Sequence, residues 1–183
     1  VFASTIDVLP DASLDVHEDL TVRFDTPNRH GIHRFIPVVY DRHGNNYTVD
    51  FKLLGVTQTG GQYVPFHTSR QGREFYIKIG DPKKTIMGLH QYHIHYTVRR
   101  ALNFFENKPE VYWNVTGDEW HMPIDKVVAQ VVFPPVGDKS ELRAKSFIGE
   151  EGSTKTLGYA LELNRATFTC AKLQPGEGLT IVL

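Results

Sequence analysis

Apolar and polar side chains alternate along the chain from residue 14 to residue 25. One phase of this alternation contains Leu14, Val16, Leu20, Val22 and Phe24. The side chains of a β-strand point alternately to its two faces, so this pattern predicts a long strand with one face on a core and the other in water. Glu18 falls in the apolar phase, where a carboxylate needs a hydrogen-bonding partner.

The same period of two recurs in residues 47–53, 74–79, 92–98 and 127–133, and in the last segment both phases are apolar. A strand that is apolar on both faces is expected in the middle of a sheet or under a loop. Gly- and Pro-containing turns separate these segments, and only residues 101–105 suit a short helical turn. We therefore predict an all-β fold with little helix, an antiparallel β-sandwich of the immunoglobulin-like or jelly-roll-like kind.

The chain after Pro135 is more polar and less periodic, but alternation returns in residues 166–170 and 178–183. No change of composition marks a linker. We expect one domain over residues 1–183 that this tail completes; the alternative is a small second lobe from about residue 135.

Composition and charge exclude several classes of protein. The 183 residues carry 20 Lys and Arg against 21 Asp and Glu, so no excess of positive charge favours nucleic-acid binding. The single cysteine, Cys170, rules out an intrachain disulfide framework and a thiolate zinc cage. The serine-hydrolase, phosphate-loop and zinc-peptidase motifs are absent from the sequence, so we expect no cofactor and no catalytic residues.

Several segments, taken together and in order, resemble one known family. They include His30-Gly-Ile-His-Arg-Phe-Ile-Pro37, Tyr92-His-Ile-His-Tyr-Thr-Val98 and Val111-Tyr-Trp-Asn-Val-Thr-Gly-Asp-Glu-Trp120. The family is that of predicted bacterial membrane proteins with domain of unknown function 2207. The resemblance implies an extracytoplasmic β domain, preceded by an export signal and anchored through membrane helices that are not in this chain. It implies no reaction and supplies no catalytic residues.

Glu18 and Arg34 are the first candidate pair. Arg34 lies in the predicted turn Gly31-Ile-His-Arg34, from which its guanidinium can pair bidentately with a carboxylate. In the structural interpretation, which we favour, this ion pair pins the strand to the loop. In the functional interpretation, Glu18 is an acid or base with a perturbed pKa.

Two histidines, His93 and His95, stand two residues apart on a predicted strand and so project from one face. Strand-borne imidazoles at this spacing are weak candidates for a metal site, with His67 or His121 as a further ligand. A metal-assisted hydrolase is the corresponding functional hypothesis. The alternative, which we favour, is a water-facing strand face that is rich in histidine.

The segment from Tyr112 to Trp120 is the most unusual in composition. Its candidate binding residues are Tyr112, Trp113, Asn114, Asp118 and Trp120. Exposed aromatic rings beside polar groups are typical of sites for a sugar or a peptide. The alternative is a structural loop with buried indoles. Our preferred hypothesis for the whole chain is a non-catalytic interaction or sensing module with a protein or glycan partner, and a carbohydrate- or peptide-binding domain is the alternative.

Overall fold

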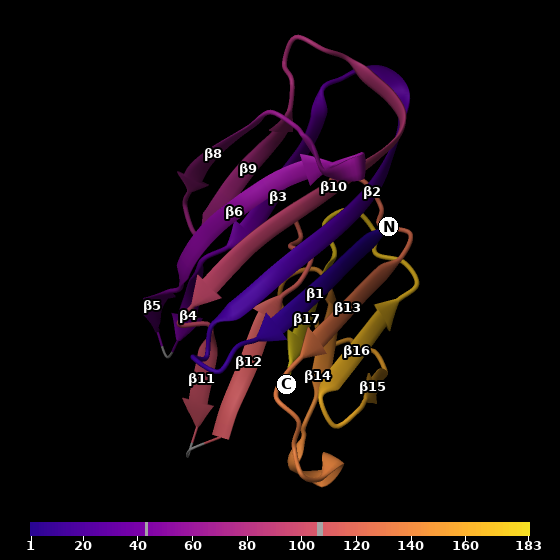
Figure 1. Ribbon diagram of the computed structural model, residues 1–183. Coiled ribbons are helices and arrows are strands. Elements are labelled where there is room, and N and C mark those ends of the chain that lie inside the picture. Colours follow the sequence, from indigo (N-terminus) through magenta and orange to yellow (C-terminus); the bar gives the residue numbers. More distant parts are fainter. Residues whose placement is uncertain (43, 106–107) are drawn as a thin grey trace.

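The computed structural model describes residues 1–42, 44–105 and 108–183, and it confirms the all-β prediction. Its largest sheet has eight strands (Figure 1). In order across the sheet these are β15 (Tyr159–Leu161), β16 (Arg165–Cys170), β13 (Val127–Val132), β1 (Phe2–Val8), β2 (Leu14–Arg29), β10 (Ile86–Arg99), β6 (Asp50–Gln58) and β7 (Gln62–Tyr63). Neighbours are antiparallel except for β1 and β13, which pair in parallel.

Three smaller sheets complete the fold. One contains β11 (Leu102–Phe105), β12 (Lys108–Asn114), β17 (Gly178–Val182) and β14 (Lys145–Gly149). Another contains β3 (Gly31–Pro37), β9 (Glu74–Gly80) and β8 (Phe66–Gln71). The third pairs β4 (Val39–Arg42) with β5 (Asn45–Thr48). Two short 3-10 turns, η1 (Thr59–Gly61) and η2 (Lys139–Glu141), are the only helical elements among the described residues.

The core lies where the eight-stranded sheet meets the smaller sheets. Tyr96 of β10 contacts Trp113 of β12 at 6.3 Å between ring centroids. Phe51 of β6 contacts Phe75 of β9 at 4.5 Å. In Figure 1 the eight-stranded sheet lies in front of β3, β8 and β9. One face of the large sheet therefore packs on the second layer, and the polar residues of β2 and β10 occupy the opposite face.

Three details differ from the sequence prediction. Residues 31–34, expected as a turn, begin strand β3, and residues 102–105, expected as a helical turn, form β11. The expected single strand over 47–53 is divided, because the chain leaves β5 at Thr48 and enters a different sheet at Asp50. Periodicity over a few residues identifies an extended chain, but it does not show where that chain changes partners.

The tail after Pro135 contributes strands to two sheets. Strand β16 pairs with β13, whereas β14 and β17 join β12. The strands of the tail thus extend sheets whose other members come from the first 135 residues. Among the described residues, no helix is long and apolar enough to cross a membrane.

Candidate functional site

Glu18 and Arg34 form a bidentate ion pair in the core. Arg34 donates from Nε to Glu18 Oε2 at 2.8 Å and from Nη2 to Glu18 Oε1 at 2.7 Å. Both side chains have an exposed fraction of 0%. Glu18 reaches this position because it shares the inward face of β2 with Val16 and Leu20, and Arg34 shares the inward face of β3 with Ile32 and Ile36. The pair therefore joins the two layers.

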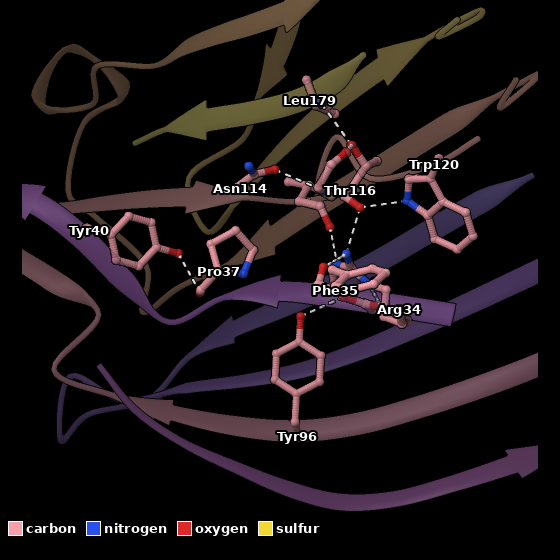
Figure 2. A network of polar contacts seen from close by, with 12 residues as sticks. Arg34, Phe35, Pro37, Tyr40, Tyr96, Asn114, Thr116, Trp120 and Leu179 are labelled. Atoms are coloured by element: carbon pink, nitrogen blue, oxygen red, sulfur yellow. Dashed lines mark hydrogen bonds and ion pairs between the residues drawn. The ribbon is translucent and has the colours of Figure 1, made fainter. Parts of the chain in front are cut away.

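The remaining donors of Arg34 hold three backbone carbonyls. Nη2 donates to Val115 O at 2.8 Å, and Nη1 donates to Thr116 O at 2.7 Å and to Phe35 O at 2.5 Å. A guanidinium has five N–H donors, so every one of them is engaged. Arg34 thus has no donor left for a ligand, and the loop after β12 is wrapped around its head group (Figure 2).

The network extends from this pair to both layers. The hydroxyl of Tyr96 donates to Glu18 Oε1 at 2.6 Å, and Trp120 Nε1 donates to Thr116 O at 2.8 Å. The backbone N–H of Leu179 donates to the Thr116 hydroxyl, which ties the loop to β17. Figure 2 shows Tyr96 below Arg34 and Thr116 above it, with Trp120 beside Thr116.

The electrostatics of the network favour the ionised pair. Burial opposes the charge on Arg34, but the nearby Glu18 carboxylate and its hydrogen bonds raise the pKa of Arg34 above its usual value. Burial, and then the negative charge of Glu18, raise the pKa of Tyr96 well above that of free tyrosine. Tyr96 therefore remains a neutral donor to Glu18 at physiological pH.

The five candidate binding residues between Tyr112 and Trp120 divide into two groups. Trp113 and Trp120 are buried, with exposed fractions of 1% and 8%, so neither presents a ring face to solvent. Asn114 accepts a hydrogen bond from the Gly117 N–H at 2.9 Å and shapes the loop. Tyr112 is exposed and Asp118 is half-buried, and both line a surface cleft.

That cleft has a volume of about 1170 Å³ and lies between the β4–β5 hairpin, β12 and β14. Among the acidic residues that line it, Glu74, Asp118 and Glu119 have carboxylate oxygens within 4.8 Å of one another. Partial burial, followed by repulsion from Glu119 and Asp118, raises the pKa of Glu74 despite the opposing effect of Arg34. No Lys or Arg of the described residues forms a salt bridge with these three carboxylates.

Tyrosines form another wall of the cleft. The ring of Tyr40 meets that of Tyr112 edge to face, with centroids 6.3 Å apart. The hydroxyl of Tyr40 donates to Pro37 O at 3.1 Å, and burial raises the pKa of Tyr40 above its usual range. The cleft therefore combines negative charge with aromatic edges, an arrangement suited to a cation or a basic side chain.

The candidate metal ligands His93 and His95 lie on the outer face of the large sheet, opposite the face that packs on the core. His93 and His95 project from one face of β10, but each pairs with an aspartate of β2. His93 Nδ1 contacts Asp19, and His95 Nε2 lies 2.6 Å from Asp15 Oδ1. Neither His67 nor His121 belongs to a group that brings potential ligand atoms together in the described part of the chain. His17 also lies beside His95, and the centroids of the two stacked imidazole rings are 4.0 Å apart.

Sequence reasoning missed Glu74, Tyr40 and His17. Glu74 and Asp118 are 44 positions apart and meet only because β9 and the loop after β12 line the same cleft. His17 had a local signal, since it lies in the polar phase of β2, but its place opposite His95 depends on the register between β2 and β10.

Comparison with known proteins identifies relatives of this chain. Residues 2–183 match the family model described as "Predicted membrane protein (DUF2207) N-terminal domain". The uncharacterized protein YciQ of Escherichia coli (strain K12) is 29% identical over 161 residues, which cover 85% of this chain and 25% of YciQ. The chain thus spans about a quarter of that curated relative.

Two solved structures share the fold. Native leukotriene A4 hydrolase from Saccharomyces cerevisiae matches 98% of this chain and 28% of its own, with a TM-score of 0.53 and 10% identity. A mutant M1 zinc metallopeptidase from Deinococcus radiodurans, bound to a Tyr-Ser-Ala substrate, matches 98% of this chain and 41% of its own, with a TM-score of 0.50 and 12% identity. At such identities the likeness shows the fold alone. The family match confirms the resemblance seen in the sequence motifs, and the chain belongs to the DUF2207 family of predicted membrane proteins, where it corresponds to the N-terminal domain.

Proposed function

We propose that this chain is a non-catalytic interaction module on the extracytoplasmic side of a membrane-anchored protein, and that its cleft binds a positively charged peptide segment. One observation carries the proposal: Glu74, Asp118 and Glu119 converge within 4.8 Å at the wall of the cleft. Three carboxylates this close repel one another unless a cation shares the space. A Lys or Arg side chain of a partner relieves that repulsion.

Neither arginine close to the acidic wall serves this purpose. Arg73 lines the cleft, but it donates to Val39 O and Asn46 Oδ1 and forms no salt bridge with the three carboxylates. Arg34 lies just behind the acidic wall, but its five donors are engaged by Glu18 and three carbonyls. Burial and the repulsion of Glu119 and Asp118 raise the pKa of Glu74. The positive charge of Arg34 lowers it, but by less, so the pKa of Glu74 stays above its ordinary value. The cleft therefore keeps an uncompensated negative charge that is available to a ligand.

The volume of the cleft and the side chains that line it favour a peptide as the ligand. Small-molecule pockets usually measure about 300–1,000 Å³, and the cleft volume of about 1170 Å³ exceeds that range. Tyr40 and Tyr112 supply aromatic edges beside the acidic group, where the aliphatic part of a lysine side chain can pack. Because Trp113 and Trp120 are buried, the surface of the Tyr112–Trp120 segment contributes through Tyr112, Asp118 and Glu119.

The proposal is tested by calorimetric titration of the purified domain with tetralysine, tetraglutamate, a Gly-Ser tetrapeptide and a neutral tetrasaccharide. We expect tetralysine to bind and added salt to weaken its binding. Glu119→Gln and Asp118→Asn should each reduce the affinity by up to about fivefold, because an exposed charge pair contributes up to about 1 kcal/mol. Glu162→Gln, which removes an exposed acid outside the cleft, is the matched control and should change nothing.

Two outcomes contradict the proposal. One is equal binding of the cationic, anionic and neutral peptides, and the other is tetralysine binding that Glu119→Gln and Asp118→Asn both leave unchanged. Binding of the tetrasaccharide alone would favour the carbohydrate alternative.

A further inference from the structure

The outer face of the β2–β10 strand pair carries a second cluster of functional groups. His17 of β2 and His95 of β10 are directly opposite each other in the antiparallel register. Their rings stack with centroids 4.0 Å apart and planes inclined by 15°. Asp15, two residues before His17, shares this face, and its Oδ1 lies 2.6 Å from His95 Nε2. This surface is separate from the cleft, since it lies on the other face of the eight-stranded sheet.

We propose that Asp15, His17 and His95 form a binding site for a divalent transition-metal ion, most specifically Zn²⁺. One ligand atom from each residue lies within 4.8 Å of the other two. In a tetrahedral zinc site with bonds of about 2.0–2.2 Å, ligand atoms are about 3.4 Å apart. His17 is exposed and Asp15 and His95 are half-buried, so the proposed site requires these side chains to rotate toward that spacing at the surface of the sheet.

The surroundings favour an ion at this position. His17 and His95 line a surface hollow of about 580 Å³ together with Gly55. Gly55 of β6 is opposite His95 and has no side chain, and a Cβ built there meets nothing within 4 Å. The hollow therefore leaves the imidazole of His95 open on the β6 side and has room for water as a fourth ligand.

The donor set also suits a transition metal in its chemistry. Two imidazoles and one carboxylate are ligands typical of zinc, whereas calcium and magnesium prefer oxygen atoms throughout. Asp7 of β1 is opposite Asp15, and Asp19 occupies the next outward position on β2 after His17. These neighbouring carboxylates add negative potential around a bound cation.

His93 has a different place in this arrangement. It lies on the same outward face, but its Nδ1 contacts Asp19 and it is not among the three converging ligands. The site therefore differs from the His93–His95 pair that the sequence offered as a candidate beside the favoured water-facing strand face. Here residues on neighbouring strands converge more closely than residues two apart on one strand.

The test is isothermal titration of the metal-free domain with ZnCl₂, followed by NMR of the histidine ring resonances. We expect one Zn²⁺ per chain and shifts in the ring signals of His17 and His95. His17→Gln, His95→Gln and Asp15→Asn should each weaken Zn²⁺ binding by at least about tenfold. His67→Gln removes an exposed histidine from β8 and is the matched control, with no expected change.

Because all four substitutions are at the surface, circular dichroism should show that each variant remains folded. The proposal is overturned if the wild-type domain binds no Zn²⁺. It is equally overturned if binding survives His17→Gln and His95→Gln at full strength, or if the shifted ring signals belong to other histidines. None of these results bears on the cleft and its peptide, which the titration with tetralysine tests separately.

Discussion

Two halves of one loop, residues 115–116 and 118–119, show opposite ways of placing charge in this domain. The first half surrounds Arg34, whose charge is buried, balanced by Glu18 and bonded at every donor. The second half presents Asp118 and Glu119 to the cleft beside Glu74, where three charges of the same sign meet near solvent. The two environments are separated by a single residue, Gly117.

The difference follows from access to water. A buried charge must find all its partners inside the protein, because an unsatisfied group costs about 1–3 kcal/mol or more. Carboxylates at a solvent-lined wall can remain unmatched, since water and ions screen them. The buried half therefore stabilises the fold, and the unmatched half is available to a ligand.

The largest expected effect comes from removing the buried charge. Arg34→Met leaves the Glu18 carboxylate in the core without its counter-charge, and it leaves the carbonyls of Phe35 and Val115 without their Arg34 donor, whereas Thr116 O keeps the hydrogen bond from Trp120. We expect the free energy of unfolding to fall by about 3–5 kcal/mol. Urea denaturation measures this, with His17→Gln on the outer face of β2 as a control that changes stability by less than about 0.5 kcal/mol.

A double variant separates the ion pair from the carbonyl network. If the pair alone mattered, Glu18→Leu combined with Arg34→Met would recover nearly all the lost stability. We expect the double variant to remain at least about 1–3 kcal/mol below wild type, because the carbonyls of Val115 and Phe35 still lack the hydrogen bonds that Arg34 donates. Full recovery would show that the loop does not depend on Arg34.

A smaller effect is expected at the junction between the two halves. Gly117 has a φ of +71°, and a Cβ there would lie 3.0 Å from Arg34 Nη1 and 3.1 Å from Phe35 O. Arg34 cannot move aside without breaking its bonds. Gly72 also has a positive φ, +59°, but a Cβ there meets nothing within 4 Å.

Gly117→Ala and Gly72→Ala both place an alanine in the left-handed backbone conformation, which costs free energy at either position. Only at Gly117 does the added methyl group also press against Arg34 and Phe35. We expect Gly117→Ala to lower the free energy of unfolding by about 1–3 kcal/mol more than Gly72→Ala does. Equal losses in parallel urea denaturations would mean that the loop yields to the added methyl group.

The buried half of the site was the more predictable from sequence. Glu18 interrupts an apolar phase, and a carboxylate inside a sheet face needs a partner wherever the strand lies. Arg34 has the same signal, since it alternates in phase with Ile32 and Ile36, although residues 31–34 were expected as a turn. The all-β class followed from the same periodicity.

The acidic wall and the His17–His95 pair could not be predicted in this way. A period of two assigns each residue to a face, but it does not specify which strands are neighbours or how they are aligned. Glu74 meets Asp118 through the packing of separate sheets, and His17 meets His95 through the register of β2 and β10. The exposure of Tyr112 and the burial of Trp113 were likewise undetermined until the phase of β12 was known.

The smallest expected effect concerns the half-buried acid of the cleft wall. Folding raises the pKa of Glu74 above its ordinary value of 4.5, through partial burial and the repulsion of Glu119 and Asp118. Its contribution to stability is therefore fully present below pH 4.5 and is lost as the pH rises through the raised value. Glu74→Gln removes this loss, so the variant should match wild type at low pH and exceed it near neutrality by less than about 1 kcal/mol, because solvent screens the group. Urea denaturation at several pH values measures the difference, with Glu162→Gln as the exposed control. A Gln variant that is less stable than wild type at neutral pH would mean that Glu74 is matched by a cation after all, and the contrast between the two halves would disappear.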